Sequence, residues 1–460
     1  MQTSSPPLVP LQAPKDVSID EIEASLREIW QSYATGDDGL AATRATTFSF
    51  LVYEPDGTQH YLSALGFYTG PIDGINGART KAAVKAAQKS YGFEVTGQAD
   101  EALVNRLQAE FSQLIARDKQ TPENLRTAAQ YAPDLEGVGI ADAIAASNPC
   151  RIITLCPTVG EDEGVTAQVS AYCPIQKRSG STLVCCEYIT LRGTANALER
   201  IGGVISALMI QDLPKFIWWK ATPHLDFDLF ERLTQDCDSL IVDSSSFSHP
   251  EADLENLGQL IDQRLVIADL NWRRLAPWQE LSAEAFDPPE RRNHIWEVDQ
   301  VVIDYEKGNP AQALMFLGWL ASRLQWVPVS YHYEGGDYDI RRIQLTGKHN
   351  RTVEVELAGI PTADWGEIPG DLISLKLASS NPKADCGTVL CSETTGCMRM
   401  EAGGGAQSLR INQVSSLTDQ KTEQLLGQQL QRWGQEVLYN ESMLLTHKIL
   451  QLAPDDLTEH

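Results

Sequence analysis

Few residues in this chain of 460 residues have the types and the spacing that enzymatic chemistry requires. A dinucleotide site would need GxGxxG between a strand and a helix, and neither Arg192-Gly193 nor Gly202-Gly203 supplies that pattern. The sequence contains no P-loop, no GxSxG elbow and no HExxH motif. Its eight histidines are scattered, at spacings that are not typical of metal ligands. We therefore predict no catalytic, cofactor-binding or metal-ligating residue.

The segment Asp243-Ser244-Ser245-Ser246 is the best candidate for a small ligand site. It directly follows an apolar run, and ligands often bind beyond the ends of strands in open α/β sheets. Taken alone, the segment could hold a phosphate or a metal ion. The favoured interpretation is structural, because Asp and Ser side chains bond loop amides and cap the next element.

Three cysteines, Cys386, Cys391 and Cys397, lie in a stretch that is predicted to be a hairpin or an exposed loop. A zinc knuckle would need closer CxxC pairing and a fourth ligand. Two of the three could come within disulfide reach across a turn, so a reversible redox switch is one hypothesis and free thiols are the other. Nine cysteines at scattered spacings fit free thiols in a reducing compartment better than a secreted disulfide framework.

Ten tryptophans are many, and several lie beside basic residues. Aromatic and arginine side chains dominate the binding energy of protein interfaces, whereas the alternative for each tryptophan is ordinary core packing. As a set they are the predicted partner interface: Trp218, Trp219, Lys220, Trp272, Arg273, Arg274, Trp278 and Trp296.

The charge balance excludes some classes of partner. Sixty-two acidic against 37 basic side chains leave a formal charge of −25, which repels nucleic acid and anionic lipid. The N-terminus lacks the basic start and apolar run of a secretory signal, and no stretch is apolar enough to span a membrane. We expect a cytoplasmic protein that binds neither nucleic acid nor membranes.

The elements around these residues predict an α/β body. Ser18 and Glu21 have the spacing of a capping box before an amphipathic helix at 19–33, and an apolar strand follows at 47–53. Between 151 and 286 short apolar runs alternate with helical stretches, which favours a mostly parallel sheet covered on both faces. We expect 19–53 to belong to the same sheet.

Residues 60–110 have a different character. Gly70-Pro71-Ile72-Asp73-Gly74 forms a turn between helical stretches, and this segment resembles the peptidoglycan-binding-like three-helix module. The segment contains no metal ligands and no carboxylate pair for glycan cleavage, so we interpret it as an inserted spacer or partner-docking surface.

The last region predicts a C-terminal α+β domain. A helix at 310–324 precedes strand-like pieces with one wet face, and 418–452 has helical periodicity. The fold class is therefore an α/β body with a mostly parallel sheet, an inserted three-helix module, and an α+β domain with antiparallel strands and terminal helices. The predicted divisions are a flexible tail (1–18), the first helix and strand of the body (19–57), the module (58–112), the body (113–292) and the C-terminal domain (293–460).

Several long segments in one order resemble the glucose-6-phosphate dehydrogenase assembly protein family, OpcA. They are ATRATTFSFLVYEP (42–55), SNPCRIITL (147–155), QDLPKFIWWK (211–220), DSLIVDSS (238–245), IADLNWRRLAPWQEL (267–281) and LGWLASRLQW (317–326). The inserted module and the later cysteines resemble cyanobacterial members.

The resemblance implies a non-catalytic allosteric activator and assembly factor. It would favour the active oligomer of glucose-6-phosphate dehydrogenase and so support NADPH production in the oxidative pentose phosphate pathway. Control by thioredoxin is a further expectation from the family, and it would give the three cysteines a role in redox regulation. Two alternatives remain: an α/β enzyme that binds a nucleotide or sugar phosphate, and a peptidoglycan-binding protein.

Overall fold

The computed structural model divides the chain into two compact units. Unit 1 holds residues 1–117, 132–242 and 422–434, and unit 2 holds residues 118–131, 243–421 and 435–460. The structure describes residues 8–34, 42–44, 46–55, 57–68, 77–118, 150–174, 183–223, 226–247, 249–361, 368, 370–381, 383–384, 387–392, 397–402, 411–416, 422–432, 434–454 and 457. The predicted domain divisions, which differ from this partition, stay a prediction.

Unit 1 is built on a mixed, mostly parallel sheet, as the alternating pattern predicts. Its strands are β1 (Leu8–Val17), β2 (Ala42–Arg44), β3 (Ser49–Tyr53), β4 (Arg151–Thr158), β5 (Thr166–Pro174), β6 (Leu183–Thr194), β7 (Lys215–Trp219) and β8 (Ser239–Val242). They lie in the order β1-β5-β6-β4-β3-β7-β8, with β2 beside β6. Strands β6, β4, β3, β7 and β8 run parallel, and this is the arrangement of the first five strands in a doubly wound dinucleotide-binding sheet.

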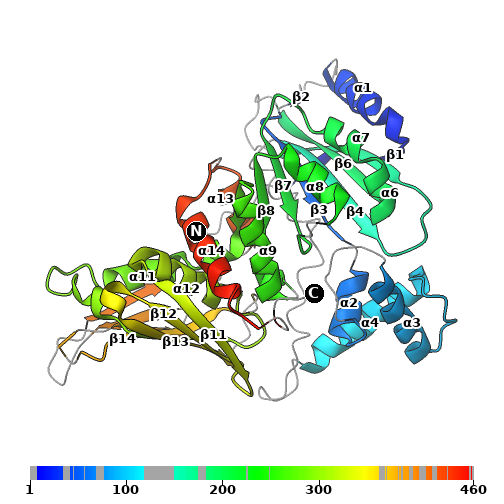
Figure 1. The fold of residues 1–460 in the computed structure, drawn as a ribbon. Coiled ribbons are helices and arrows are strands. Elements are labelled where there is room, and N and C mark those ends of the chain that lie inside the picture. Colours follow the sequence, from blue (N-terminus) through cyan, green and yellow to red (C-terminus); the bar gives the residue numbers. More distant parts are fainter. Residues whose placement is uncertain are drawn as a thin grey trace. The chain divides into compact units, whose positions relative to one another are not determined.

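Apolar runs explain the central position of these strands. Every residue of β3 is buried, as expected of a strand covered on both faces. Helices α6 (Ala195–Arg200), α7 (Gly202–Leu208) and α8 (Asp228–Gln235) lie along one face of the sheet (Figure 1). A further short helix of unit 1, α13 (Thr422–Gln429), buries Leu425 and Leu426.

The N-terminal elements belong to the same sheet, as predicted. The helix expected at 19–33 is a short 3-10 turn, η1 (Ile19–Glu21), followed by α1 (Ile22–Ala34). Ser18 and Glu21 form the capping box, and Ile22, Leu26 and Ile29 make the buried face. Residues 8–17 correct the expectation of a flexible tail, because they form β1 and pair antiparallel with β5.

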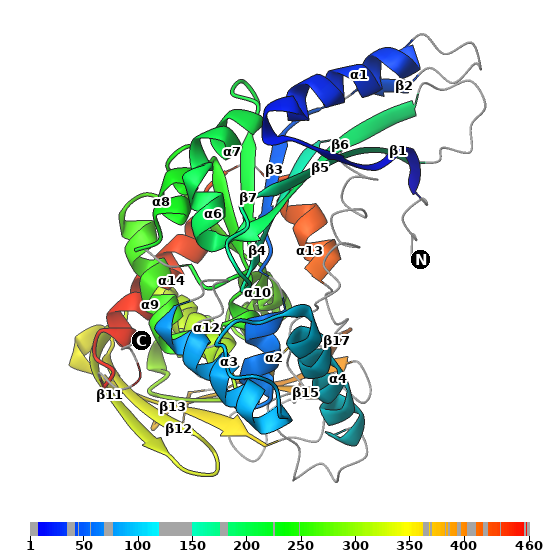
Figure 2. The same cartoon turned by 90° about the vertical axis from the view of Figure 1, so that its right-hand side faces the viewer.

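The inserted module contains α2 (Thr58–Ala64), α3 (Ala78–Tyr91) and α4 (Glu101–Asp118), which pack side by side (Figure 2). It lies between β3 and β4, two strands that are parallel neighbours. Its core includes Leu62, Val84 and Leu107, none of which is exposed. Helix α3 ends at Gly92, whose φ of 75° is the left-handed conformation that glycine adopts at helix C-termini.

Unit 2 contains a mostly antiparallel sheet with helices on one face (Figure 1). The strands are β10 (Gln300–Glu306), β11 (Val327–Gly335), β12 (Ile340–Thr346), β13 (Thr352–Ile360), β14 (Leu372–Ala378), β15 (Gly387–Ser392), β16 (Cys397–Ala402) and β17 (Ile411–Ser416). Their order is β11-β12-β13-β10-β14-β15-β16-β17. Strand β10 runs parallel to its neighbour β13 and antiparallel to its other neighbour β14. The other elements of the unit are η4 (Ser244–Ser246), α9 (Pro250–Asp262), β9 (Ile267–Asp269), α10 (Leu270–Arg274), α11 (Ala276–Glu284), η5 (His294–Glu297), α12 (Ala311–Leu324), η6 (Lys348–Asn350) and α14 (Val437–Leu450).

The predicted C-terminal helix packs in the interior of unit 2. Helix α14 contacts α9 and α12, and it buries Tyr439, Met443 and Ile449 completely. Two glycines allow the close approach. An added Cβ at Gly258 would lie 2.5 Å from Cβ of His447, and one at Gly318 would meet Thr446 Oγ1.

Among the described residues, no helix is long and apolar enough to cross a membrane.

Candidate functional site

The Asp243 segment is a capped turn held by an ion pair with the buried Arg274. Asp243 precedes η4, and its carboxylate accepts hydrogen bonds from the Ser245 amide at 3.2 Å and from Ser245 Oγ at 2.6 Å. The guanidinium of Arg274 donates to both carboxylate oxygens, at 2.8 and 2.9 Å. Both oxygens of the Asp243 carboxylate therefore already bind groups of the same chain. This segment was the predicted candidate for a phosphate or metal site.

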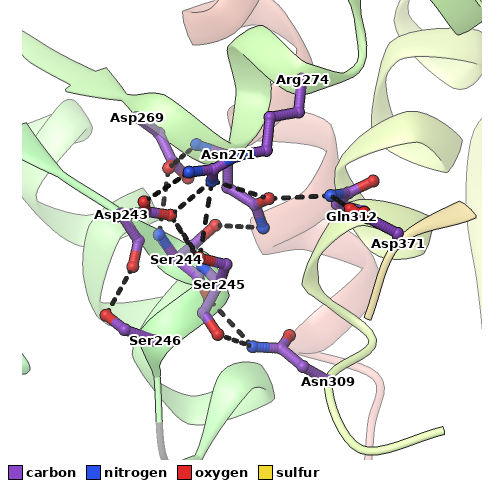
Figure 3. A network of polar contacts seen from close by, with 10 residues as sticks. All are labelled: Asp243, Ser244, Ser245, Ser246, Asp269, Asn271, Arg274, Asn309, Gln312 and Asp371. Atoms are coloured by element: carbon purple, nitrogen blue, oxygen red, sulfur yellow. Dashed lines mark hydrogen bonds and ion pairs between the residues drawn. The ribbon is translucent and has the colours of Figure 1, made fainter. Parts of the chain in front are cut away.

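The same network continues through neighbouring elements (Figure 3). One oxygen of Asp269 accepts from the amides of Ser244 and Asn271, at 3.1 and 2.8 Å. The side-chain amide of Asn309 donates to the carbonyls of Ser244 and Ser245. Gln312 connects Asn271 to Asp371. These contacts join η4, α10 and α12 and brace unit 2, which is the structural interpretation of the segment.

The pKa values of two of the three carboxyl groups in this network, Asp243 and Asp269, are shifted in opposite directions. Burial disfavours the charge on Asp243, but Arg274 outweighs burial and lowers the pKa of Asp243. Burial, reinforced by the neighbouring Asp243 charge, raises the pKa of Asp269 to about 6. No group of three or more His, Cys, Asp or Glu side chains among the described residues is arranged to hold a metal ion.

Four tryptophans of the predicted interface are core residues. Trp218 and Trp219 are 2% and 1% exposed, and Trp272 and Trp278 are each 3% exposed. Packing inside the chain explains them, so the prediction of a surface formed by all eight residues is wrong in this respect. Trp296 in η5 is 39% exposed and carries Lys348 over its ring at 3.2 Å. Its role in partner contact stays a prediction.

The three basic residues of that predicted set form internal ion pairs. Lys220 lies 2.6 Å from Glu54, and Arg274 pairs with Asp243. Arg273 lies 3.3 Å from Glu436. Their charges are therefore neutralised within the chain.

The corner where β3 and β7 end is where a doubly wound sheet with this strand order binds its dinucleotide. The last residues of the two strands, Tyr53 and Trp219, are buried and stack with ring centroids 3.7 Å apart. Glu54 follows β3 directly and pairs with Lys220. A carboxylate at this position repels phosphate, and the lysine charge beside it is neutralised. Aromatic packing and an ion pair thus occupy the corner in the described part of the chain.

The structure locates two of the three cysteines of the predicted switch. Cys391 on β15 pairs in register with Met398, and Cys397 on β16 pairs with Ser392, so the cysteines lie on the two arms of one hairpin and are not directly opposite. Cys386 lies outside the described residues. Elsewhere Cys150 and Cys237 are free thiols, whereas Cys185 is disulfide-bonded and corrects the expectation of free thiols at that position.

Comparison with known proteins identifies the family. Residues 141–259 match the model of the N-terminal domain of the glucose-6-phosphate dehydrogenase subunit, and residues 265–443 match the model of its C-terminal domain. Residues 58–107 match the model of a "Putative peptidoglycan binding domain". A protein of Synechocystis sp. named "Putative OxPP cycle protein OpcA" is 62% identical over 98% of this chain and 95% of its own length. The chain belongs to the OpcA family.

OpcA proteins with the same name from Nostoc punctiforme and Synechococcus elongatus are 57% and 51% identical over 98% and 96% of this chain, and over 97% of each relative. Solved structures that match part of the chain include the K102A mutant of KijD10, a 3-ketoreductase from Actinomadura kijaniata, with 13% identity and a TM-score of 0.36 over 52% of this chain and 76% of that one. The dehydrogenase GnnA from Acidithiobacillus ferrooxidans has 10% identity and a TM-score of 0.33 over 58% and 89%. These scores are too low to assign chemistry to an OpcA chain.

Several residues of this OpcA chain that matter in the structure are not among the predicted site residues. Asp269 was detectable, because it ends an apolar strand just as Asp243 does. The pairing of Glu54 with Lys220 had no signal, because the partners are 166 residues apart. The same holds for Asn309 and Asp371, which reach the network from outside any motif.

Proposed function

We propose that this chain is a non-catalytic effector that binds glucose-6-phosphate dehydrogenase and favours its active oligomer. The observation that carries the proposal is the match to both domain models of the dehydrogenase subunit, combined with 62% identity over nearly the whole chain to a relative named for the OxPP cycle. The filled corner between β3 and β7 supports a role without a cofactor reaction of its own.

An effector of this kind acts through differential affinity. It must bind the active assembly more tightly than the inactive one, because a ligand with equal affinity for both shifts nothing. A difference of about 1.4 kcal/mol would activate a poorly populated state about tenfold. No bond has to be made or broken by this chain.

The direct experiment mixes the purified chain with the dehydrogenase of the same organism. Initial rate and molar mass are measured together, by NADPH absorbance and by light scattering, as the chain is titrated. We expect the rate to rise and saturate near a fixed stoichiometry while the mass of the complex increases, and we expect the chain alone to show no turnover. Unchanged rate and mass at saturating concentration would overturn the proposal.

An α/β enzyme is the second candidate, and the strand order β6-β4-β3-β7-β8 favours it. Glu54 beside Lys220 argues against phosphate binding at the corner where such an enzyme binds its cofactor. Thermal shift with NADP and with glucose 6-phosphate distinguishes the two proposals, because a ligand that binds the native state alone raises Tm. We expect no shift with either compound.

We further propose that the β15–β16 hairpin carries the redox switch, with Cys386 as the third cysteine. Cys391 and Cys397 lie on paired strands and are one position apart in register, so a one-residue shift of β15 against β16 would place them directly opposite each other. Thiol counting on the oxidised and the thioredoxin-reduced chain, with peptide mapping of these cysteines, tests the proposal. Equal thiol counts at the three positions would end it.

A further inference from the structure

Helix α3 of the inserted module presents a row of three lysines on its outer face. Lys81, Lys85 and Lys89 are exposed and are spaced by four residues, which is about 6 Å along a helix. The inner face of the helix is fixed by the module core, where Val84 and Ala87 are completely buried. The core therefore holds the lysine row outward. We call these three residues the lysine face.

The lysine face is electrostatically unpartnered. Like charges four residues apart destabilise a helix, and no ion pair involves these lysines in the described part of the chain. Helix α4 of the same module shows the usual solution, because its Arg106 pairs with Glu110 four residues later at 2.7 Å. The protein carries 62 acidic side chains, so the lysines do not lack ion pairs for want of acidic residues in the sequence. An ordinary solvated face would mix its charges, as α4 does.

The charge distribution selects the class of partner. Residues 58–112 contain five acidic and five basic side chains, so the chain's charge of −25 comes from outside the module. That charge repels polyanions such as nucleic acid and anionic membranes as a whole molecule approaches. A local acidic patch on a protein is attracted by the lysine face at contact distance, where screening is least effective.

We propose that the lysine face docks onto an acidic surface of the dehydrogenase, as a second contact beside the one made by the two family domains. This inference rests on the proposed function. The two family domain models cover 141–259 and 265–443, and the module lies outside both. A second contact on the same chain is effectively intramolecular, so even weak ion pairing raises the overall affinity.

Binding to the purified dehydrogenase is measured by biolayer interferometry at about 50 and about 200 mM NaCl, with four forms of the full chain. The test variant carries Lys81→Gln, Lys85→Gln and Lys89→Gln. The charge-preserving control replaces the same lysines with arginine. The matched control, Ala102→Glu with Asn105→Glu and Ala109→Glu, makes the same change in net charge on exposed positions of α4.

We expect the glutamine variant to bind about tenfold more weakly at low salt and to lose most of its salt dependence. The arginine variant and the α4 variant should stay within about twofold of the native chain. Circular dichroism and the melting temperature verify that all four forms fold. Equal affinity of the native chain and the glutamine variant overturns the docking inference, and so does an equal loss in the α4 variant, which would indicate a general effect of charge.

The outcomes separate this inference from the function on which it rests. A native chain that does not bind the dehydrogenase refutes the proposed function, whereas a native chain that binds as tightly as the glutamine variant refutes docking alone. Two further probes are single-stranded polyuridylate and phosphatidylglycerol vesicles. Binding of the native chain to either, abolished in the glutamine variant while dehydrogenase binding is unchanged, assigns the lysine face to another partner and overturns the inference.

Discussion

Two arginine–aspartate pairs of similar geometry differ in their burial. Arg274 contacts both carboxylate oxygens of Asp243 in the interior, and Arg200 contacts both of Asp162 at the surface. Replacing Arg274 with alanine leaves the Asp243 carboxylate, whose side chain is only 14% exposed, without its counter-charge, so we expect a loss of about 3 kcal/mol in unfolding free energy. Urea denaturation measures it. Arg200→Ala is the control and should leave stability nearly unchanged, and equal losses would contradict this account.

Asp269 predicts an unusual dependence of stability on pH. Its folded pKa is raised to about 6 by burial and by Asp243, so the unfolded chain ionises first as pH rises. Native stability should therefore fall between about pH 4 and pH 6. Asp269→Asn keeps the oxygen that accepts from Ser244 and Asn271 but cannot ionise. Its stability relative to the native chain should improve by roughly 3 kcal/mol between pH 4 and pH 7.

The control for the Asp269 experiment is Asp162→Asn. Hydrogen bonding by Arg200 lowers the pKa of Asp162, so its contribution to stability is present at neutral pH and is lost as pH falls. The two asparagine variants should thus respond to pH with opposite signs when unfolding is followed by urea at each pH. A difference between Asp269→Asn and the native chain that does not change with pH would refute the prediction.

At the scale of elements, two glycines, Gly258 in α9 and Gly318 in α12, determine how closely α14 packs within unit 2. A methyl group at Gly318 would meet Thr446 Oγ1 and would lie 2.6 Å from the Ser442 carbonyl, in the middle of the α12–α14 contact. We expect Gly318→Ala to cost about 1–3 kcal/mol of unfolding free energy, because neighbouring backbone must move. In helix α7, Gly203 has nothing within 4 Å of an added Cβ.

The matched control Gly203→Ala should stabilise the chain by about 0.5–1 kcal/mol, because alanine in a helix loses less conformational entropy on folding. Differential scanning calorimetry on both variants gives the comparison. Opposite signs support close helix packing as the reason for glycine at 318, whereas stabilisation by both substitutions would show that α14 can shift at no cost.

Local signals made some elements predictable and left others hidden. The capping box at Ser18 and the apolar stripe of α12 gave helices within a few residues of those in the structure. β1 has no local signal, because its partner β5 lies 150 or more residues away in sequence and because Pro10 and Pro14 are typical of an unstructured tail. Prolines are tolerated in β1 because it is an edge strand.

The residues of the predicted interface show the limit of sequence composition. Trp218 and Trp219 follow one another in a strand and are both buried, because β7 is covered on both faces. The local sequence of a tryptophan next to a lysine or arginine is the same whether the pair lies at a binding surface or at the end of a buried strand. Only the long-range contacts of Lys220 with Glu54 and of Arg274 with Asp243 distinguish the two.

The whole molecule carries one sign of charge in large excess. With a formal charge of −25, the carboxylates lie closer together in the folded state than in the unfolded chain, and they therefore repel one another more strongly in the folded state. The Debye length falls from about 30 Å at 10 mM salt to about 8 Å at 150 mM, so added salt removes much of this repulsion. The buried ion pairs, such as Arg341 with Glu251, are screened far less.

We therefore expect the melting temperature of the native chain to rise by about 2–4 °C when NaCl is raised from about 10 to about 150 mM. Differential scanning fluorimetry measures the change, and sucrose at equal osmolarity controls for exclusion of solute from the protein surface. A fall in melting temperature would mean that surface pairs such as Arg342 with Glu334 and Glu356 outweigh the repulsion. The same increase in salt should weaken binding to the dehydrogenase, because salt also screens the lysine face. A higher melting temperature together with a lower affinity would therefore distinguish screening of self-repulsion from screening of the lysine face.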